Sequence, residues 1–263
     1  AMSRIRVLER RYEFSYQYLI EGRYSPETQL GVLSLEKNGA RLEGWGHLPE
    51  RMRLSAPSQP LPDVVEIALL LRPVPMEAPR PRLGEGRFVE PFQVINPTDA
   101  AALALALELQ RRDPDRVTVT AYAVAGNDAP GILRDALARG VDRAVHIDTG
   151  RTSSFRYDAR LVAETFAAAQ GERPPAVILC GDTAADTGQS AVASFVAAFL
   201  GHEVVNGVES VSWNVAGDAL VVGGSGWEGH ELEYSLPIVL SAADGAEFDC
   251  PYDMLAVLRA AAF

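Results

Sequence analysis

The stretch that decides the fold opens with Ile95-Asn96-Pro97-Thr98-Asp99 and runs on to Gly140-Val141-Asp142-Arg143-Ala144-Val145-His146-Ile147. Asn96-Pro97 ends the preceding element and Asp99 is typical of a helix start, after which residues 100–109 are strong helix formers. Residues 117–124 are β-branched and strand-like, residues 130–139 are helical up to Gly140, and 144–147 form the next strand. Strand and helix alternate without a hairpin signal, which predicts an α/β fold with a mostly parallel sheet and crossover helices.

The rest of the chain extends this pattern. We expect strands at 65–71 and 176–180 and helices at 158–170, 188–200 and 251–262. Short strands predicted at 208–213, 219–223 and 231–240 are separated by glycine-rich turns, which indicates antiparallel additions at an edge of the sheet or a small separate sheet.

The first 60 residues differ from the remainder. Residues 4–20 are strand-like, and Asn38-Gly39 between two apolar runs is a strong hairpin signal. This segment holds nine Lys and Arg against seven Asp and Glu, whereas the whole chain holds 24 against 35. We therefore predict two parts: a β-rich extension with a proline-rich linker at 1–60, and an α/β domain at 61–263.

The net charge of −11 disfavours nucleic acid or an anionic membrane surface as the main partner. Cys180 and Cys250 are too few for a secreted disulfide framework, and no apolar run is long enough for a membrane span. We expect a protein of the cytoplasm or of another reducing compartment. The histidines, His47, His146, His202 and His230, are scattered without metal-ligand spacing, so we predict no metal site.

Four motifs, in this order and spacing, resemble the β subunit of electron-transfer flavoproteins over about residues 63–263. They are Asn96-Pro97 before the first long helix, Ala125-Gly126 after a strand, Gly140-Val141-Asp142-Arg143 with His146, and Thr187-Gly188-Gln189 after the strand ending at Gly181. The resemblance implies an open, mostly parallel sheet with helices on both faces, of the adenine-nucleotide α-hydrolase-like or Rossmann-like kind.

In that family the carboxyl ends of the strands hold a nucleotide, which is AMP in the simple type and a second flavin in the bifurcating type. The resemblance implies nucleotide-binding positions at Leu69, Asn96, Ala125, Asp182, Asp186, Thr187, Gly188 and Gln189. It places Arg72 beside the loop that approaches the flavin of the α subunit. Gly126 and Thr183 join the cofactor-binding positions because a glycine allows close backbone approach and a hydroxyl suits a phosphate or ribose. The residues themselves agree, because a helix opening at Gly188 would offer backbone N–H groups to a phosphate.

Other readings of these residues remain open. Asp186 and Thr187 are also ordinary helix-capping residues, and an arginine at a sheet end, such as Arg72, often pairs with a carboxylate. The family's loop before Thr187 is several residues longer, so that AMP, FAD and no nucleotide are all alternatives here.

The resemblance also implies partners. The β subunit pairs with an α-type subunit that holds the redox FAD, and a dehydrogenase docks on the segment that corresponds to Pro251, Tyr252 and Met254. Pro251 is equally suited to the first turn of a helix. We expect no catalytic residues in this chain, since redox chemistry belongs to the cofactor. The alternative functions are an adenine-nucleotide-binding module without a redox role and a purely structural subunit of the same fold.

Overall fold

The chain divides into two compact units, Ala1–Ala56 and Pro57–Phe263. The computed structural model describes residues 63–75, 93–126, 128–149, 158–171, 173–224, 227, 231–243 and 251–260, with the strands that lie between 3 and 47 and those at 82–84 and 87–89. No helix in these ranges is long and apolar enough to cross a membrane.

The first unit is a five-stranded antiparallel sheet. Its strands are β1 (Ser3–Arg11), β2 (Phe14–Gly22), β3 (Tyr24–Ser25), β4 (Leu30–Lys37) and β5 (Ala40–His47). Lys37 lies opposite Ala40, which confirms the hairpin predicted at Asn38-Gly39. The strand-like segment 4–20 is two strands rather than one, because β1 and β2 pair as a hairpin with Arg11 opposite Phe14.

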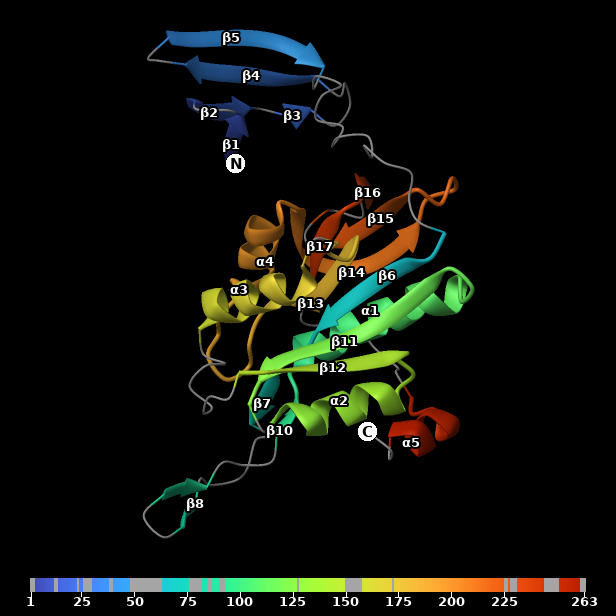
Figure 1. Ribbon diagram of the computed structural model, residues 1–263. Helices are drawn as coiled ribbons and strands as arrows, with labels where there is room; N and C mark the ends of the chain where they lie inside the picture. Colours follow the sequence, from blue (N-terminus) through green and yellow to red (C-terminus); the bar gives the residue numbers. More distant parts are fainter. Residues whose placement is uncertain are drawn as a thin grey trace. The chain divides into compact units, whose positions relative to one another are not determined.

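The second unit is built on an eight-stranded sheet in the order β12-β11-β6-β13-β17-β14-β15-β16 (Figure 1). The strands are β6 (Val65–Leu70), β11 (Val117–Ala125), β12 (Arg143–Asp148), β13 (Val177–Gly181), β14 (Glu203–Trp213), β15 (Ala219–Gly224), β16 (Glu231–Ser235) and β17 (Ile238–Ala242). Neighbours from β12 to β14 are parallel, and β15 and β16 add antiparallel pairs at one edge. The predicted α/β class with a mostly parallel sheet is confirmed.

Helices cover both faces of this sheet, as Figure 1 shows. They are α1 (Pro97–Arg112), α2 (Ala129–Ala138), α3 (Ala159–Gln170), α4 (Val192–Leu200) and α5 (Met254–Ala260). Side chains of α1 and α2 share one apolar cluster with Ile67 and Leu69 of β6, whereas α3 and α4 share another with Ala68 and Leu70. Each central strand therefore buries both of its faces, which explains its continuous apolar sequence.

One sequence prediction is wrong in an informative way. Residues 231–240, expected as a single edge strand, form β16 at the edge and β17 in the middle of the sheet, separated by Leu236-Pro237. Pro237 has no backbone N–H to give to a strand ladder, so it favours a break there. All five residues of β17 are buried, whereas the first three residues of β16 are exposed and the last two are half-buried. The two strands are both five residues long, and their burial tells the central strand from the edge strand.

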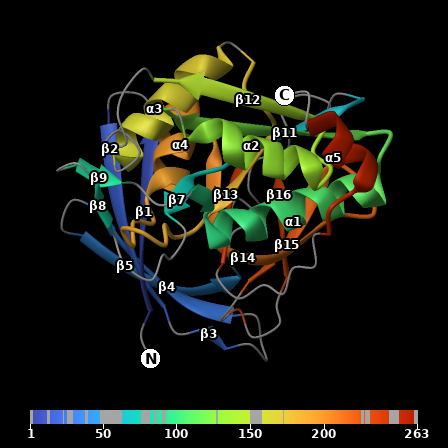
Figure 2. The ribbon, with the colours of Figure 1, turned by 90° about the horizontal axis from the view of Figure 1, so that it is seen from below.

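Two short strand pairs lie in the segment between β6 and α1. β7 (Pro73–Pro75) pairs with β10 (Gln93–Ile95), and β8 (Arg82–Gly84) pairs with β9 (Arg87–Val89). The chain therefore leaves β6 and returns beside it to start α1. Helix α5 packs beside α2, which also contacts β10, and both Figure 1 and Figure 2 show α5 next to α2.

Candidate functional site

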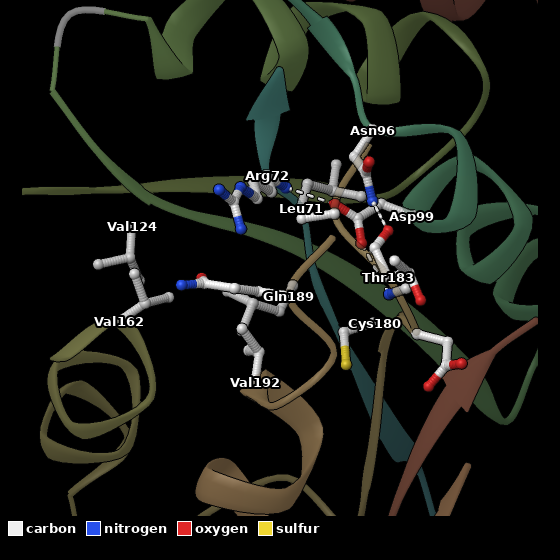
Figure 3. Close-up of a pocket in the computed structure, with 14 residues that line it drawn as sticks. Leu71, Arg72, Asn96, Asp99, Val124, Val162, Cys180, Thr183, Gln189 and Val192 are labelled. Carbon is white, nitrogen blue, oxygen red and sulfur yellow. Dashed lines mark hydrogen bonds between the residues drawn. The ribbon is translucent and has the colours of Figure 1, made fainter. Parts of the chain in front are cut away.

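A pocket lies at the carboxyl ends of β6 and β13 (Figure 3). From β6 the chain crosses through α1 to β11 on one side, while β13 lies on the other side. This is the point where the strand order reverses, and ligands of open α/β sheets bind at such points. The pocket is lined by Leu70, Leu71, Arg72, Asn96, Asp99, Val124, Val162, Cys180, Gly181, Asp182, Thr183, Ala184, Gln189 and Val192.

The pocket has a polar end and an apolar end. In Figure 3 the Asn96, Asp99 and Thr183 side chains gather on one side, and Val124 and Val162 lie on the opposite side. Its cavity volume is about 40 Å³. A cavity of this size has room for about three water molecules.

Asn96 ties the start of α1 to the loop that follows β13. Pro97 occupies the first helical position, where a missing N–H costs nothing. The Asn96 Nδ2 donates to the carbonyl oxygen of Thr183 at 3.0 Å, and its Oδ1 accepts from the N–H of Ala185 at 2.9 Å. The Thr98 hydroxyl donates to the same Thr183 carbonyl at 2.7 Å. The side chains at the helix start therefore fix the backbone of the loop.

Asp99 joins the ends of the two strands that flank the pocket. One carboxylate oxygen accepts from the N–H of Arg72 after β6, and the other accepts from the N–H of Gly181 at the end of β13, both at 2.7 Å. Burial raises the pKa of Asp99 to about 6, against the lowering effect of these two backbone hydrogen bonds. Sequence reasoning identified Asp99 only as a helix starter, because its two donors come from segments distant in the chain.

Gly181 lets the strand end approach α1 closely. A Cβ atom at this position would collide with the side chains of Thr98 and Asp99, and would lie 2.6 Å from the backbone nitrogen of Asp99. Only glycine fits here without displacing the start of the helix. The close packing of β13 against the start of α1 therefore requires a glycine at position 181.

Arg72 forms an ion pair with Asp186 at the end of β6. The Nη2 of Arg72 lies 3.0 Å from Oδ1 of Asp186, and the two side chains are only 13% and 10% exposed. The same nitrogen is 3.4 Å from the hydroxyl of Thr187. Of the two interpretations of Arg72 from the sequence, pairing with a carboxylate is the one that the geometry shows.

The loop from Asp182 to Gln189 is closed by its own hydrogen bonds. The N–H of Ala184 donates to the Gln189 carbonyl at 2.9 Å, and that of Gly188 donates to the Ala184 carbonyl at 2.7 Å. Gly188 has a φ of 68°, which a right-handed helix does not allow. The helix predicted to begin at Gly188 therefore begins at Val192, so this prediction is wrong.

The structure brings five of the predicted cofactor residues to the pocket wall: Arg72, Asn96, Asp182, Thr183 and Gln189. The other six do not line it. Leu69 is in the apolar core beneath α1, and Ala125 accepts a hydrogen bond from His146 at the end of β11. Gly126, Asp186, Thr187 and Gly188 lie in the connections around the pocket. As cofactor-binding residues all eleven stay a prediction.

Sequence reasoning missed the apolar part of the wall. Val124, Val162 and Val192 come from three different elements and looked like ordinary core residues. Cys180 also lines the pocket; it is buried, and burial raises the pKa of its thiol. Cys250 lies outside the described residues. Among those residues, no group of three His, Cys, Asp or Glu side chains is arranged to hold a metal ion.

The segment before α5 does not line this pocket and is anchored on α2. The Tyr252 hydroxyl donates to Asp135 at 2.7 Å and accepts from Arg139 at 3.2 Å. The Arg139 guanidinium also lies over the Tyr252 ring, 4.6 Å from its centroid. Tyr252 is nevertheless 59% exposed and Met254 75% exposed, and Pro251 is exposed as well.

The fold and the position of the pocket define an open, Rossmann-like α/β protein, and comparison with known proteins gives its family. The model of the electron transfer flavoprotein domain matches residues 90–246, more than half of the chain. The electron transfer flavoprotein subunit beta of Syntrophomonas wolfei subsp. wolfei (strain DSM 2245B / Goettingen) is 34% identical over 151 residues, which are 57% of each protein. The chain thus belongs to the electron transfer flavoprotein family, and the resemblance to its β subunits is confirmed.

Proposed function

We propose that this chain is a β-type subunit of an electron-transfer flavoprotein that pairs with an α-type subunit. The observation that carries the proposal is the match to the electron transfer flavoprotein domain over residues 90–246, which hold the loop after β13 and every strand of the eight-stranded sheet except β6. The match to the relative spans 57% of that protein's length, so the assembly and its electron flow belong to the proposal.

In this proposal the α-type partner holds most of the FAD, which supplies the redox chemistry when it is bound. This chain supplies a rigid base. Asp99 joins the ends of β6 and β13, Asn96 fixes the following loop, and the Arg72 side chain is held at the edge of the pocket. Such fixed polar groups keep a partner surface in one shape.

We also propose that Pro251, Tyr252 and Met254 are where the electron-donating dehydrogenase docks. Tyr252 and Met254 are large, exposed side chains, and an exposed tyrosine with its ring held in place is a favourable anchor. A groove of about 420 Å³ lies beside Tyr252, between β10 and α2. Its floor includes Val94, Ile95 and Ile132, so it offers an apolar recess next to the anchor.

The test is to co-express the full chain with an α-type subunit from the same source and purify the product. The expected result is a one-to-one complex that carries FAD and is reduced by a dehydrogenase of that source. A colourless chain that forms no complex would contradict the proposal and favour a structural or nucleotide-binding role without redox chemistry.

A variant tests the docking segment within the same complex. Met254→Ser should slow reduction by the dehydrogenase several-fold and leave the FAD content unchanged, because Met254 is exposed and contacts little of its own chain. Val215→Ser is the matched control, since Val215 is fully exposed in the turn between β14 and β15. If the dehydrogenase reduces both variants and the unmodified complex at the same rate, Met254 is not part of the docking site.

A further inference from the structure

The Arg72–Asp186 ion pair ties Asp186, to which the family resemblance assigns nucleotide binding, to a guanidinium at the pocket wall. Arg72 follows β6 at the switch point, and Asp186 comes from the loop after β13. Both side chains are about nine-tenths buried. A guanidinium removed from water needs a negative partner, and here the chain supplies that partner itself.

Several backbone N–H groups of the loop already have acceptors. A phosphate at a helix start is held by N–H groups that have no other acceptor. In this loop the N–H groups of Asp182, Ala184, Ala185 and Gly188 each have an acceptor within the chain. The helix that could present further N–H groups starts only at Val192.

The space does not suit a nucleotide either. Pockets for small molecules typically enclose about 300–1,000 Å³, and this cavity measures about 40 Å³. An Asp186 carboxylate beside the guanidinium would in addition repel a phosphate. The residues present therefore do not fit AMP in the arrangement that the structure shows.

We infer that Asp186 takes the place of a bound phosphate at Arg72, so that this chain folds without a nucleotide and binds an anion at Arg72 only when that carboxylate is removed. Among the described residues the buried Asp186 oxygens accept no hydrogen bond, and their compensation is the charge of Arg72. In this inference the Arg72 guanidinium is an anion-binding group whose anion is the Asp186 carboxylate of the same chain. This inference concerns the chain alone and does not rest on electron transfer.

The first experiment uses the full chain as purified. The protein is denatured, and released nucleotides are quantified by mass spectrometry. We expect far less than one equivalent of AMP or FAD per chain. One equivalent of either would overturn the inference directly.

The second experiment compares melting temperatures in phosphate and in chloride at equal ionic strength. Asp186→Ala should melt below the unmodified chain in chloride, and phosphate should raise its melting temperature by several degrees, because binding to the native state stabilises it. The unmodified chain should show only the smaller, general stabilisation that phosphate gives folded proteins, which is the baseline for every variant. Asp186→Asn serves the same purpose if the alanine variant does not fold.

Two controls separate Arg72 from general effects. The double variant Arg72→Gln/Asp186→Ala lacks the guanidinium and should lose the response to phosphate beyond this baseline. Asp182→Ala removes a carboxylate of the same loop that accepts from Ser241 instead, and it should melt lower without responding to phosphate beyond the baseline. An equal phosphate response in the unmodified chain or in the double variant, or no response beyond the baseline in either Asp186 variant, would overturn the inference.

Discussion

At the scale of single residues, we predict that Asp99 makes the stability of the protein depend on pH. Its pKa is about 6 in the folded chain against an ordinary 3.8, mainly because it is buried. A raised folded pKa stabilises the fold below the unfolded pKa, and this contribution is lost as the pH rises through about 6. From pH 5 to pH 7.5 the free energy of unfolding should therefore fall by roughly 1.4 kcal/mol through this group.

The measurement is urea unfolding of the unmodified chain and of Asp99→Asn at both pH values. The variant should be less stable at both, because the Asn amide turns a donor toward the N–H of Arg72 or Gly181, and it should lose this part of the pH dependence. Glu108→Gln, on the exposed side of the same helix, is the control. If the stability of the Asp99 variant depends on pH as strongly as that of the unmodified chain, other titratable groups cause the pH dependence.

At the scale of elements, two glycines should respond to alanine in opposite directions. Gly181→Ala places a methyl group against Thr98 and Asp99, where β13 meets α1, and should destabilise the protein by about 1–3 kcal/mol. Gly131→Ala lies in α2 with open space around the new Cβ, and should stabilise it by about 0.5–1 kcal/mol through helix propensity. Chemical denaturation measures the free energy of unfolding of both variants. If Gly181→Ala is as stable as Gly131→Ala, β13 and α1 can move apart at little cost to fit the methyl group.

At the scale of the whole molecule, we predict that residues 61–263 fold without residues 1–60. Both faces of the eight-stranded sheet are covered by helices of the second unit, and the family match lies entirely within it. A domain of about 200 residues with its own core can fold alone. The shortened chain should show the far-ultraviolet circular dichroism of a folded α/β domain, and it should unfold cooperatively.

The same deletion tests what the first unit does. If the extension is an arm that contacts the α-type partner, the shortened chain should fold but assemble more weakly with that subunit. Unchanged assembly would remove this role. Loss of cooperative unfolding would show instead that the two units depend on each other for stability.

The sequence by itself determined what depends on neighbours along the chain. The alternation of β-branched runs with helix formers specified the parallel α/β class, and Asn96-Pro97 followed by Asp99 placed the start of α1. The hairpin at Asn38-Gly39 was equally local. These features arise from backbone preferences and turn chemistry, which act over a few residues. The family motifs could be recognised because each of them is a short run of neighbouring residues.

Only the tertiary structure decided which distant segments meet. In the structure β17 lies between β13 and β14, α4 begins at Val192, and β12 lies at the edge of the sheet. The fold also pairs Arg72 with Asp186 and joins Asp99 to Gly181. Strand order and buried ion pairs depend on packing between segments far apart in sequence, where charge and burial are settled by the whole fold rather than by local pattern.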